Sequence, residues 1–131
     1  MFSSTVQFVA DHAEGRLLDP IAGTGYWAYL LTQLGVDAQI VAKDCAEAAA
    51  LHPDRTLFLS WPPHDQDVGA RILLAYNGNR LIYVGDGRGG GTGDDQMHQI
   101  LETRWSEVDS RQPVLWWGQR DRVTVYERRG P

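Results

Sequence analysis

A strand, a glycine turn and a helix follow one another over residues 17–31, and this succession constrains the fold more than any other stretch. Residues 16–19 read as a short buried strand, and residues 25–34 have the apolar spacing of a helix. Gly23 and Gly25 lie between them, and glycines let the backbone turn sharply and approach a ligand. The following helix presents free N–H groups and a positive dipole end. The stretch therefore predicts a binding turn at the carboxyl end of a strand.

The remainder of the chain alternates between the two kinds of element. We expect helices over residues 4–13, 25–34, 45–51, 66–76 and 94–104, and strands over residues 16–19, 37–43, 56–60, 80–84, 105–108 and 123–127. This alternation predicts an α/β fold, a three-layer sandwich with helices on both faces of a mostly parallel sheet. Residues 123–127 read Val-Thr-Val-Tyr-Glu, an alternation that indicates a terminal, antiparallel edge strand.

Length and composition exclude several classes of protein. The 131 residues correspond to a single domain, residues 1–131. With a net charge of −5, the sequence lacks the excess of basic residues that is typical of nucleic-acid-binding proteins. No apolar run reaches membrane-spanning length. One cysteine excludes an intrachain disulfide, four scattered histidines show no metal-ligand spacing, and no signal peptide is apparent. We therefore expect a soluble, cytoplasmic protein without a metal.

Unusual sequence features follow four of the expected strands. In open parallel sheets, ligands bind beyond the carboxyl ends of the strands. The features are residues 19–25, Asp44, residues 60–64 and the glycine-rich loop 85–93. The loop lacks the Gly-Lys-Ser/Thr ending of a phosphate-binding loop, which argues against that function. The convergence of all four predicts a ligand site at one edge of the sheet.

In their order along the chain, these residues resemble a class I S-adenosylmethionine-dependent methyltransferase. They are Asp19, Gly23, Gly25, Asp44 and the run Ser60-Trp61-Pro62-Pro63-His64. The resemblance covers residues 16–128 and implies a Rossmann-like fold with S-adenosyl-L-methionine as cofactor. Two residues depart from the family pattern. Ile21 occupies the position of the first glycine in the family's glycine-rich motif, and Trp61 replaces a polar residue before the two prolines.

Two parts of the family domain are expected to be reduced. Little chain precedes residue 16, so the resemblance implies that the lid over the cofactor is nearly absent. The connection between Asp44 and Thr56 is too short for the usual helix, strand and helix. We therefore expect that the family's third strand is missing.

The resemblance also implies roles for individual residues. The cofactor-binding candidates are Asp19, Ala22, Gly23, Thr24, Gly25, Tyr26, Asp44, Cys45, Ser60, Trp61 and Pro62. His64 is the first candidate for a catalytic base, and Asp86 is a further one. Several of these residues also have purely structural interpretations: Asp19 as a strand-end cap, Asp44 as an N-cap of the helix over 45–51, and Trp61 as core packing.

Three functions remain open on this sequence. The first is methyl transfer from S-adenosylmethionine to a small-molecule acceptor. The second is a degenerate domain that binds S-adenosylmethionine, a nucleotide or a partner without turnover, because Ile21 could crowd the cofactor. The third is an NAD-type oxidoreductase domain, which explains Gly23, Gly25, Ala28 and Asp44 but not the two prolines. A homodimer would cover a site without a lid and the tryptophan-rich C-terminal region.

Overall fold

The computed structural model describes residues 4–20, 26–40, 45–63, 65–85, 92–111 and 122–129. Five helices and six strands lie in these ranges. The helices are α1 (Ser4–His12), α2 (Tyr26–Gln33), α3 (Cys45–Leu51), α4 (Val68–Ala75) and α5 (Asp95–Arg104). The strands are β1 (Arg16–Asp19), β2 (Asp37–Ile40), β3 (Thr56–Ser60), β4 (Arg80–Gly85), β5 (Trp105–Arg111) and β6 (Arg122–Arg128). The alternation expected from the sequence is confirmed.

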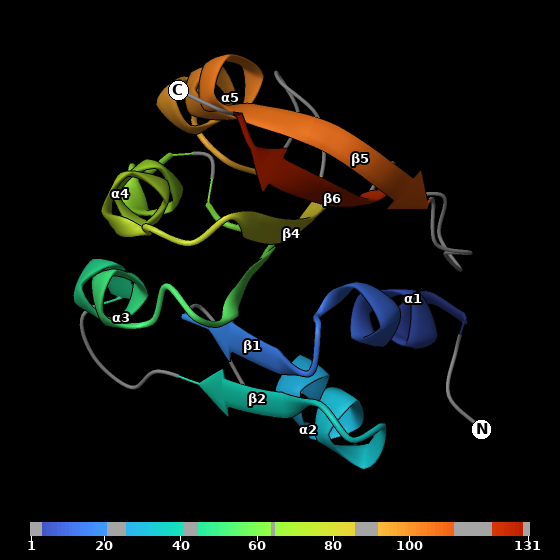
Figure 1. The fold of residues 1–131 in the computed structure, drawn as a ribbon. Coiled ribbons are helices and arrows are strands. Elements are labelled where there is room, and N and C mark those ends of the chain that lie inside the picture. The colour runs from blue at the N-terminus through green and yellow to red at the C-terminus, as the bar shows by residue number, and fades with distance from the viewer. Residues whose placement is uncertain are drawn as a thin grey trace.

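All six strands join one sheet in the order β2-β1-β3-β4-β6-β5. β2, β1, β3 and β4 pair in parallel, whereas β6 pairs antiparallel with both β4 and β5. Helices α1 and α2 cover one face, and α3, α4 and α5 cover the other (Figure 1). The structure is therefore the expected three-layer sandwich with an antiparallel C-terminal edge.

The strand over 122–128 is not itself at that edge. β6 lies between β4 and β5, and the edge strand is β5, which extends three residues past the expected end at Val108. Val123 and Val125 are fully buried, while most of β5 is exposed. The alternation of polar and apolar residues indicates which face of a strand is buried, but it does not indicate how many strands pair with it. The predicted position of residues 123–127 was therefore wrong, although the strand itself was predicted correctly.

The expected loss of one strand is also observed. Residues 45–55 contain α3 and a turn, with no strand, and β3 pairs with β1 directly. β2 is consequently the outer parallel strand, and its described residues are Asp37–Ile40. Among the described residues it pairs with a strand on one side only, so side-chain contacts add to its attachment.

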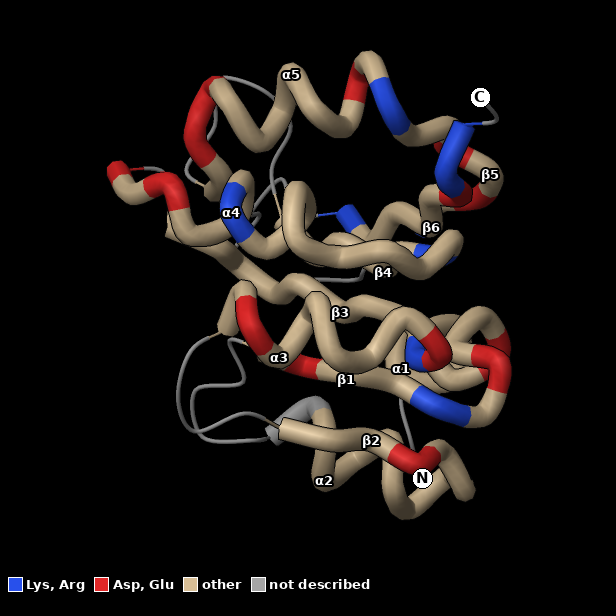
Figure 2. Tube along the Cα trace, turned by 60° about the vertical axis from the view of Figure 1, so that its left-hand side comes forward, with Lys and Arg blue, Asp and Glu red and all other residues tan. Residues whose placement is uncertain are grey.

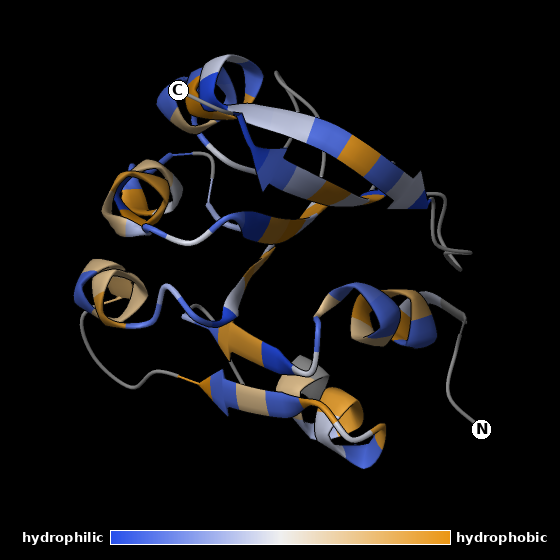
Figure 3. Cartoon of the chain, viewed as in Figure 1, coloured by the Kyte–Doolittle hydropathy of each residue, from blue (hydrophilic) through white to orange (hydrophobic). Residues whose placement is uncertain are grey.

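Two apolar cores occupy the two sides of the sheet. Leu17, Phe58, Ile82 and Val84 point toward α1 and α2, and Leu18, Leu57, Leu59 and Tyr83 point toward the other three helices. Apolar positions concentrate in the central strands and on the inner sides of the helices (Figure 3). No described helix has the length and apolar character needed to cross a membrane.

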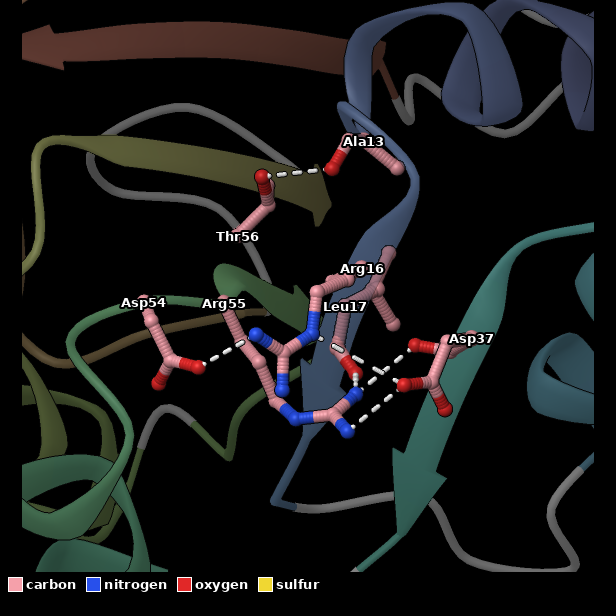
Figure 4. A network of polar contacts seen from close by, with 7 residues as sticks. All are labelled: Ala13, Arg16, Leu17, Asp37, Asp54, Arg55 and Thr56. Atoms are coloured by element: carbon pink, nitrogen blue, oxygen red, sulfur yellow. Dashed lines mark hydrogen bonds and ion pairs between the residues drawn. The ribbon is translucent and has the colours of Figure 1, made fainter.

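Arg55 provides the support for β2. Its side chain is 8% exposed, and its guanidinium donates to the carbonyl oxygens of Leu17 (3.1 Å) and Asp37 (2.8 Å). It also donates to the Asp37 carboxylate at 2.8 Å (Figure 4). Arg16 extends the network through an ion pair with Asp54 at 2.6 Å. One side chain thus ties the start of β2 to β1 from the turn that precedes β3.

Candidate functional site

The register of the parallel strands brings their carboxyl ends to one edge of the sheet. Asp19 lies opposite Ile40, the last described residue of β2, and Ser60 lies opposite Val84 near the end of β4. The four sequence features that follow these strands therefore start from the same edge. This edge is the position at which open α/β sheets bind their ligands.

Asp19 ends β1 and is completely buried. Removing a carboxylate from water costs free energy unless nearby groups compensate its charge. Asp19 therefore lies where the chain leaves the sheet at the carboxyl end of β1, with its side chain enclosed by the protein.

The thiol of Cys45 connects the segments that follow β1 and β2. Cys45 begins α3, and its Sγ donates to the carbonyl oxygen of Pro20 at 2.9 Å. The side chain also packs against the apolar core on that side of the sheet. These contacts place Cys45 beside the end of β1.

Trp61 has an unusual backbone conformation directly after β3. Its φ is +48°, and its side chain is 46% exposed. Positive φ is rare for a bulky residue, and a following proline restricts the backbone further toward extended conformations. Strained residues of this kind concentrate at functional sites, where the surrounding structure enforces them. The backbone N–H of Trp61 donates to the carbonyl of Val84 at 2.8 Å, which holds the turn in place.

A polar network fixes the two prolines that follow. The carbonyl of Pro62 accepts from the N–H of Gly93 at 2.7 Å, and Pro63 forms a bridge with Thr92. Thr92 is held in turn by the Tyr83 hydroxyl, 2.5 Å from its Oγ1, and by His98 Nε2, which donates to its carbonyl at 2.9 Å. These contacts fix the position of residues 61–63 relative to β4 and α5. Sequence reasoning missed this network, because residues 92–98 offered only a glycine-rich loop and a helix cap.

The structure describes five of the predicted site residues with their side chains. Asp19, Cys45, Ser60, Trp61 and Pro62 lie at or next to the carboxyl edge. The other candidates fall outside the description: Ala22, Gly23, Thr24, Gly25, Asp44, His64, Asp86 and the side chain of Tyr26. Within the described ranges, His, Cys, Asp and Glu side chains do not form a group of three that could hold a metal ion.

Solved structures that match the chain include proteins described as methyltransferases. A Streptococcus pneumoniae protein described as a candidate tRNA (m1A22) methyltransferase, in complex with S-adenosyl-L-methionine, matches with a TM-score of 0.62 and 17% identity over 98% of this chain and 73% of its own. Burkholderia thailandensis 1,6-didemethyltoxoflavin-N1-methyltransferase, with its acceptor and S-adenosylhomocysteine bound, matches with a TM-score of 0.56 and 16% identity over 95% of this chain and 78% of its own.

A candidate rRNA methylase from Clostridium thermocellum matches with a TM-score of 0.51 and 10% identity, over 95% of this chain and 93% of its own. No protein-family model matches the chain, and neither does any curated protein. At these identities the matches establish the fold. The chain thus has the fold of class I S-adenosylmethionine-dependent methyltransferases, and the acceptors of the matched proteins differ from one another.

The conformation of Trp61 leads to a prediction about stability. A non-glycine residue in the left-handed region costs roughly 1–2 kcal/mol. Trp61→Gly should therefore be more stable than Trp61→Ala by about 1 kcal/mol, measured by urea denaturation. Tyr29, which is exposed within α2, provides the matched control. There the order should reverse, with glycine about 1 kcal/mol less stable than alanine. The same order at both positions would contradict the strained conformation.

Proposed function

We propose that this chain binds S-adenosyl-L-methionine along the carboxyl ends of β1 and β2 and transfers its methyl group to a small-molecule acceptor. The observation that carries the proposal is the buried Asp19 at the end of β1, within a sheet of the order β2-β1-β3-β4-β6-β5. Two of the matched structures of this fold hold S-adenosylmethionine or S-adenosylhomocysteine. An NAD-type oxidoreductase domain is less well supported, because the matched structures are methyltransferases.

The residues present fit this cofactor. The Asp19 carboxylate would compensate the methionine ammonium, directly or through the N–H groups of the glycine turn. Asp44 would accept hydrogen bonds from the ribose hydroxyls, as acids after the second strand do in related nucleotide sites. Cys45 would form part of the wall of the adenine site. When bound, S-adenosylmethionine supplies an electrophilic methyl group on a sulfonium.

Methyl transfer requires mainly that the acceptor atom is aligned with that methyl group. The carbonyl of Pro62 accepts a hydrogen bond from the N–H of Gly93, so residues 61–63 form a rigid surface against which an acceptor could lie. The half-exposed Trp61 ring would stack on a planar acceptor. His64 is proposed as the base for an acceptor that carries a proton, and Asp86 as the second candidate.

The overall charge of the chain favours a small acceptor over RNA, although two of the matched proteins are candidate RNA methylases. A net charge of −5 would repel a polyanion. Ile21, in place of a family glycine, supports the alternative of binding without turnover. Both forms of the proposal require that the cofactor binds.

Calorimetric titration with S-adenosylhomocysteine and S-adenosylmethionine tests the proposal. We expect saturable binding of both, with one site per chain, and no binding of NADH under the same conditions. Absence of binding to either compound at millimolar concentration would refute it. Binding of NADH alone would instead support the oxidoreductase alternative.

A further inference from the structure

Trp61 lies in a backbone conformation that neighbouring segments must hold in place. Its φ of +48° is in the left-handed region, and such strain persists only where the surrounding structure enforces it. The N–H of Gly93 donates to the carbonyl of Pro62 at 2.7 Å. Pro63 forms an antiparallel bridge with Thr92. Residues 92 and 93 therefore hold the backbone that follows Trp61.

Two side chains from other elements hold Thr92. The hydroxyl of Tyr83 on β4 lies 2.5 Å from its Oγ1. His98, near the start of α5, lies with its Nε2 atom 2.9 Å from the carbonyl oxygen of Thr92. A carbonyl oxygen only accepts hydrogen bonds, so the Nε2 atom of His98 carries the proton. All three residues are buried, so a contact that is lost is not readily replaced by one to water.

The imidazole of His98 is held in one orientation. Its ring meets that of Tyr83 edge to face, with 6.1 Å between the ring centroids. The backbone N–H of His98 donates to the carbonyl of Asp94 at 3.2 Å, and the carboxylate of Asp94 caps the helix through the N–H of Met97. The first turn of α5 therefore places the Nε2 atom at a defined point beside Thr92.

Close packing around Gly93 and Pro62 limits how far they can shift. Gly93 has a φ of +71°, a conformation that glycine adopts without steric cost. A Cβ atom at this position would lie 2.9 Å from the Nε2 atom of His98 and 2.9 Å from the sulfur of Met97. A Cβ atom on Gly69 of α4 would lie 3.4 Å from the side chain of Pro62, and Figure 2 shows α4 and α5 side by side. Both helices therefore restrict where Gly93 and Pro62 can lie.

We propose that His98 is a positioning residue for the candidate methyl-transfer site. Its Nε2–H fixes the Thr92 carbonyl, which keeps Gly93 in position to donate to Pro62. That hydrogen bond in turn maintains the left-handed conformation of Trp61. His98 acts through these residues and not by contact with a ligand. The consequence for binding rests on the proposed function, because Trp61 and Pro62 border the cofactor only under that proposal, whereas the effect on Trp61 itself does not.

Fluorine NMR of the full chain, labelled with fluorotryptophan, measures the conformation of Trp61. The resonance of Trp61 is the one that is absent from Trp61→Phe. His98→Phe fills the space and cannot donate a hydrogen bond, so it should shift or broaden this resonance. His98→Gln presents a side-chain N–H in place of the imidazole and should leave the resonance close to its original position. Should His98→Phe not fold, His98→Leu removes the same hydrogen bond with a smaller side chain.

Calorimetric titration with S-adenosylhomocysteine measures the consequence for binding. If the ligand must restore the conformation of Trp61, the apparent affinity falls in proportion to the fraction of molecules that retain it. We expect His98→Phe to weaken binding about fivefold or more, and His98→Gln less than about twofold, at a temperature where both are fully folded. His12→Phe is the matched control, because it removes a histidine that pairs with Asp109 at 3.0 Å on the other face of the sheet. It should change neither the affinity nor the Trp61 resonance.

Two results would overturn the proposal. The first is an unchanged Trp61 resonance in folded His98→Phe. The second is an equal effect of His98→Gln and His98→Phe on both measurements, because a packing role depends on the shape of the side chain and not on its donor. If the unaltered chain does not bind S-adenosylhomocysteine, the proposed function fails, and the Trp61 resonance alone then decides the role of His98.

Discussion

Arg55→Met should lower the free energy of unfolding by about 3 kcal/mol, because hydrogen bonds from a charged donor contribute about 1.5–3 kcal/mol and a broken buried pair costs 3–5 kcal/mol. The lower end of the range for a buried pair applies, since the Asp37 carboxylate is 60% exposed and water will solvate it in the variant. Methionine keeps the apolar stem and removes only the guanidinium. Urea denaturation followed by circular dichroism measures the change.

Arg71→Met is the matched control for Arg55. Arg71 in α4 is exposed and pairs at 3.0 Å with Asp67, the residue before α4, so its loss should cost less than about 0.5 kcal/mol. Hydrogen exchange should also locate the effect, with faster exchange in β2 of Arg55→Met before the central strands are affected. A loss below about 1 kcal/mol in Arg55→Met would mean that the network in Figure 4 does not hold β2.

Asp19→Asn should reduce the affinity for S-adenosylhomocysteine at least tenfold without lowering the stability of the chain. The amide has nearly the same shape and cannot compensate an ammonium, so about 1.4 kcal/mol or more of binding free energy is lost. The buried charge is removed at the same time, which offsets any loss of hydrogen bonds in the folded state. Calorimetry measures the affinity, and thermal unfolding measures the stability.

Asp54→Asn serves as the control for Asp19→Asn. Asp54 is an exposed carboxylate at the opposite edge of the sheet, where it pairs with Arg16. The affinity of the Asp54→Asn variant for S-adenosylhomocysteine should equal that of the unaltered chain. A folded Asp19→Asn protein with unchanged affinity would remove Asp19 from the proposed site.

The elements were predictable because the periodicity of apolar residues is a local property. Leu57, Phe58 and Leu59 are all buried, as a continuous apolar run indicates for a strand covered on both faces. Gly35, with a φ of +86°, lies in the turn after α2, and Asp94 caps α5 by accepting from the N–H of Met97 at 2.8 Å. These short-range signals determined the boundaries of most elements to within one or two residues.

Features that depend on contacts between distant segments were not predictable. Arg55 reads as part of a polar turn, and its burial follows from the carbonyl groups that β1 and β2 present to it. The positive φ of Trp61 could not be predicted from the sequence, because a tryptophan before a proline indicates extended backbone. The hollow between α5 and strands β4, β5 and β6 combines side chains from all four elements that individually resemble solvated or core positions.

The position of the cofactor is the central claim, and a crystal structure of the chain with S-adenosylhomocysteine tests it most directly. We predict that the ligand lies across the carboxyl ends of β1 and β2, with its ammonium group near Asp19 and its adenine near Cys45. Trp61 and Pro62 should border the sulfur. A ligand bound elsewhere on the protein, or a site at β1 that stays empty under saturating S-adenosylhomocysteine, would contradict the account.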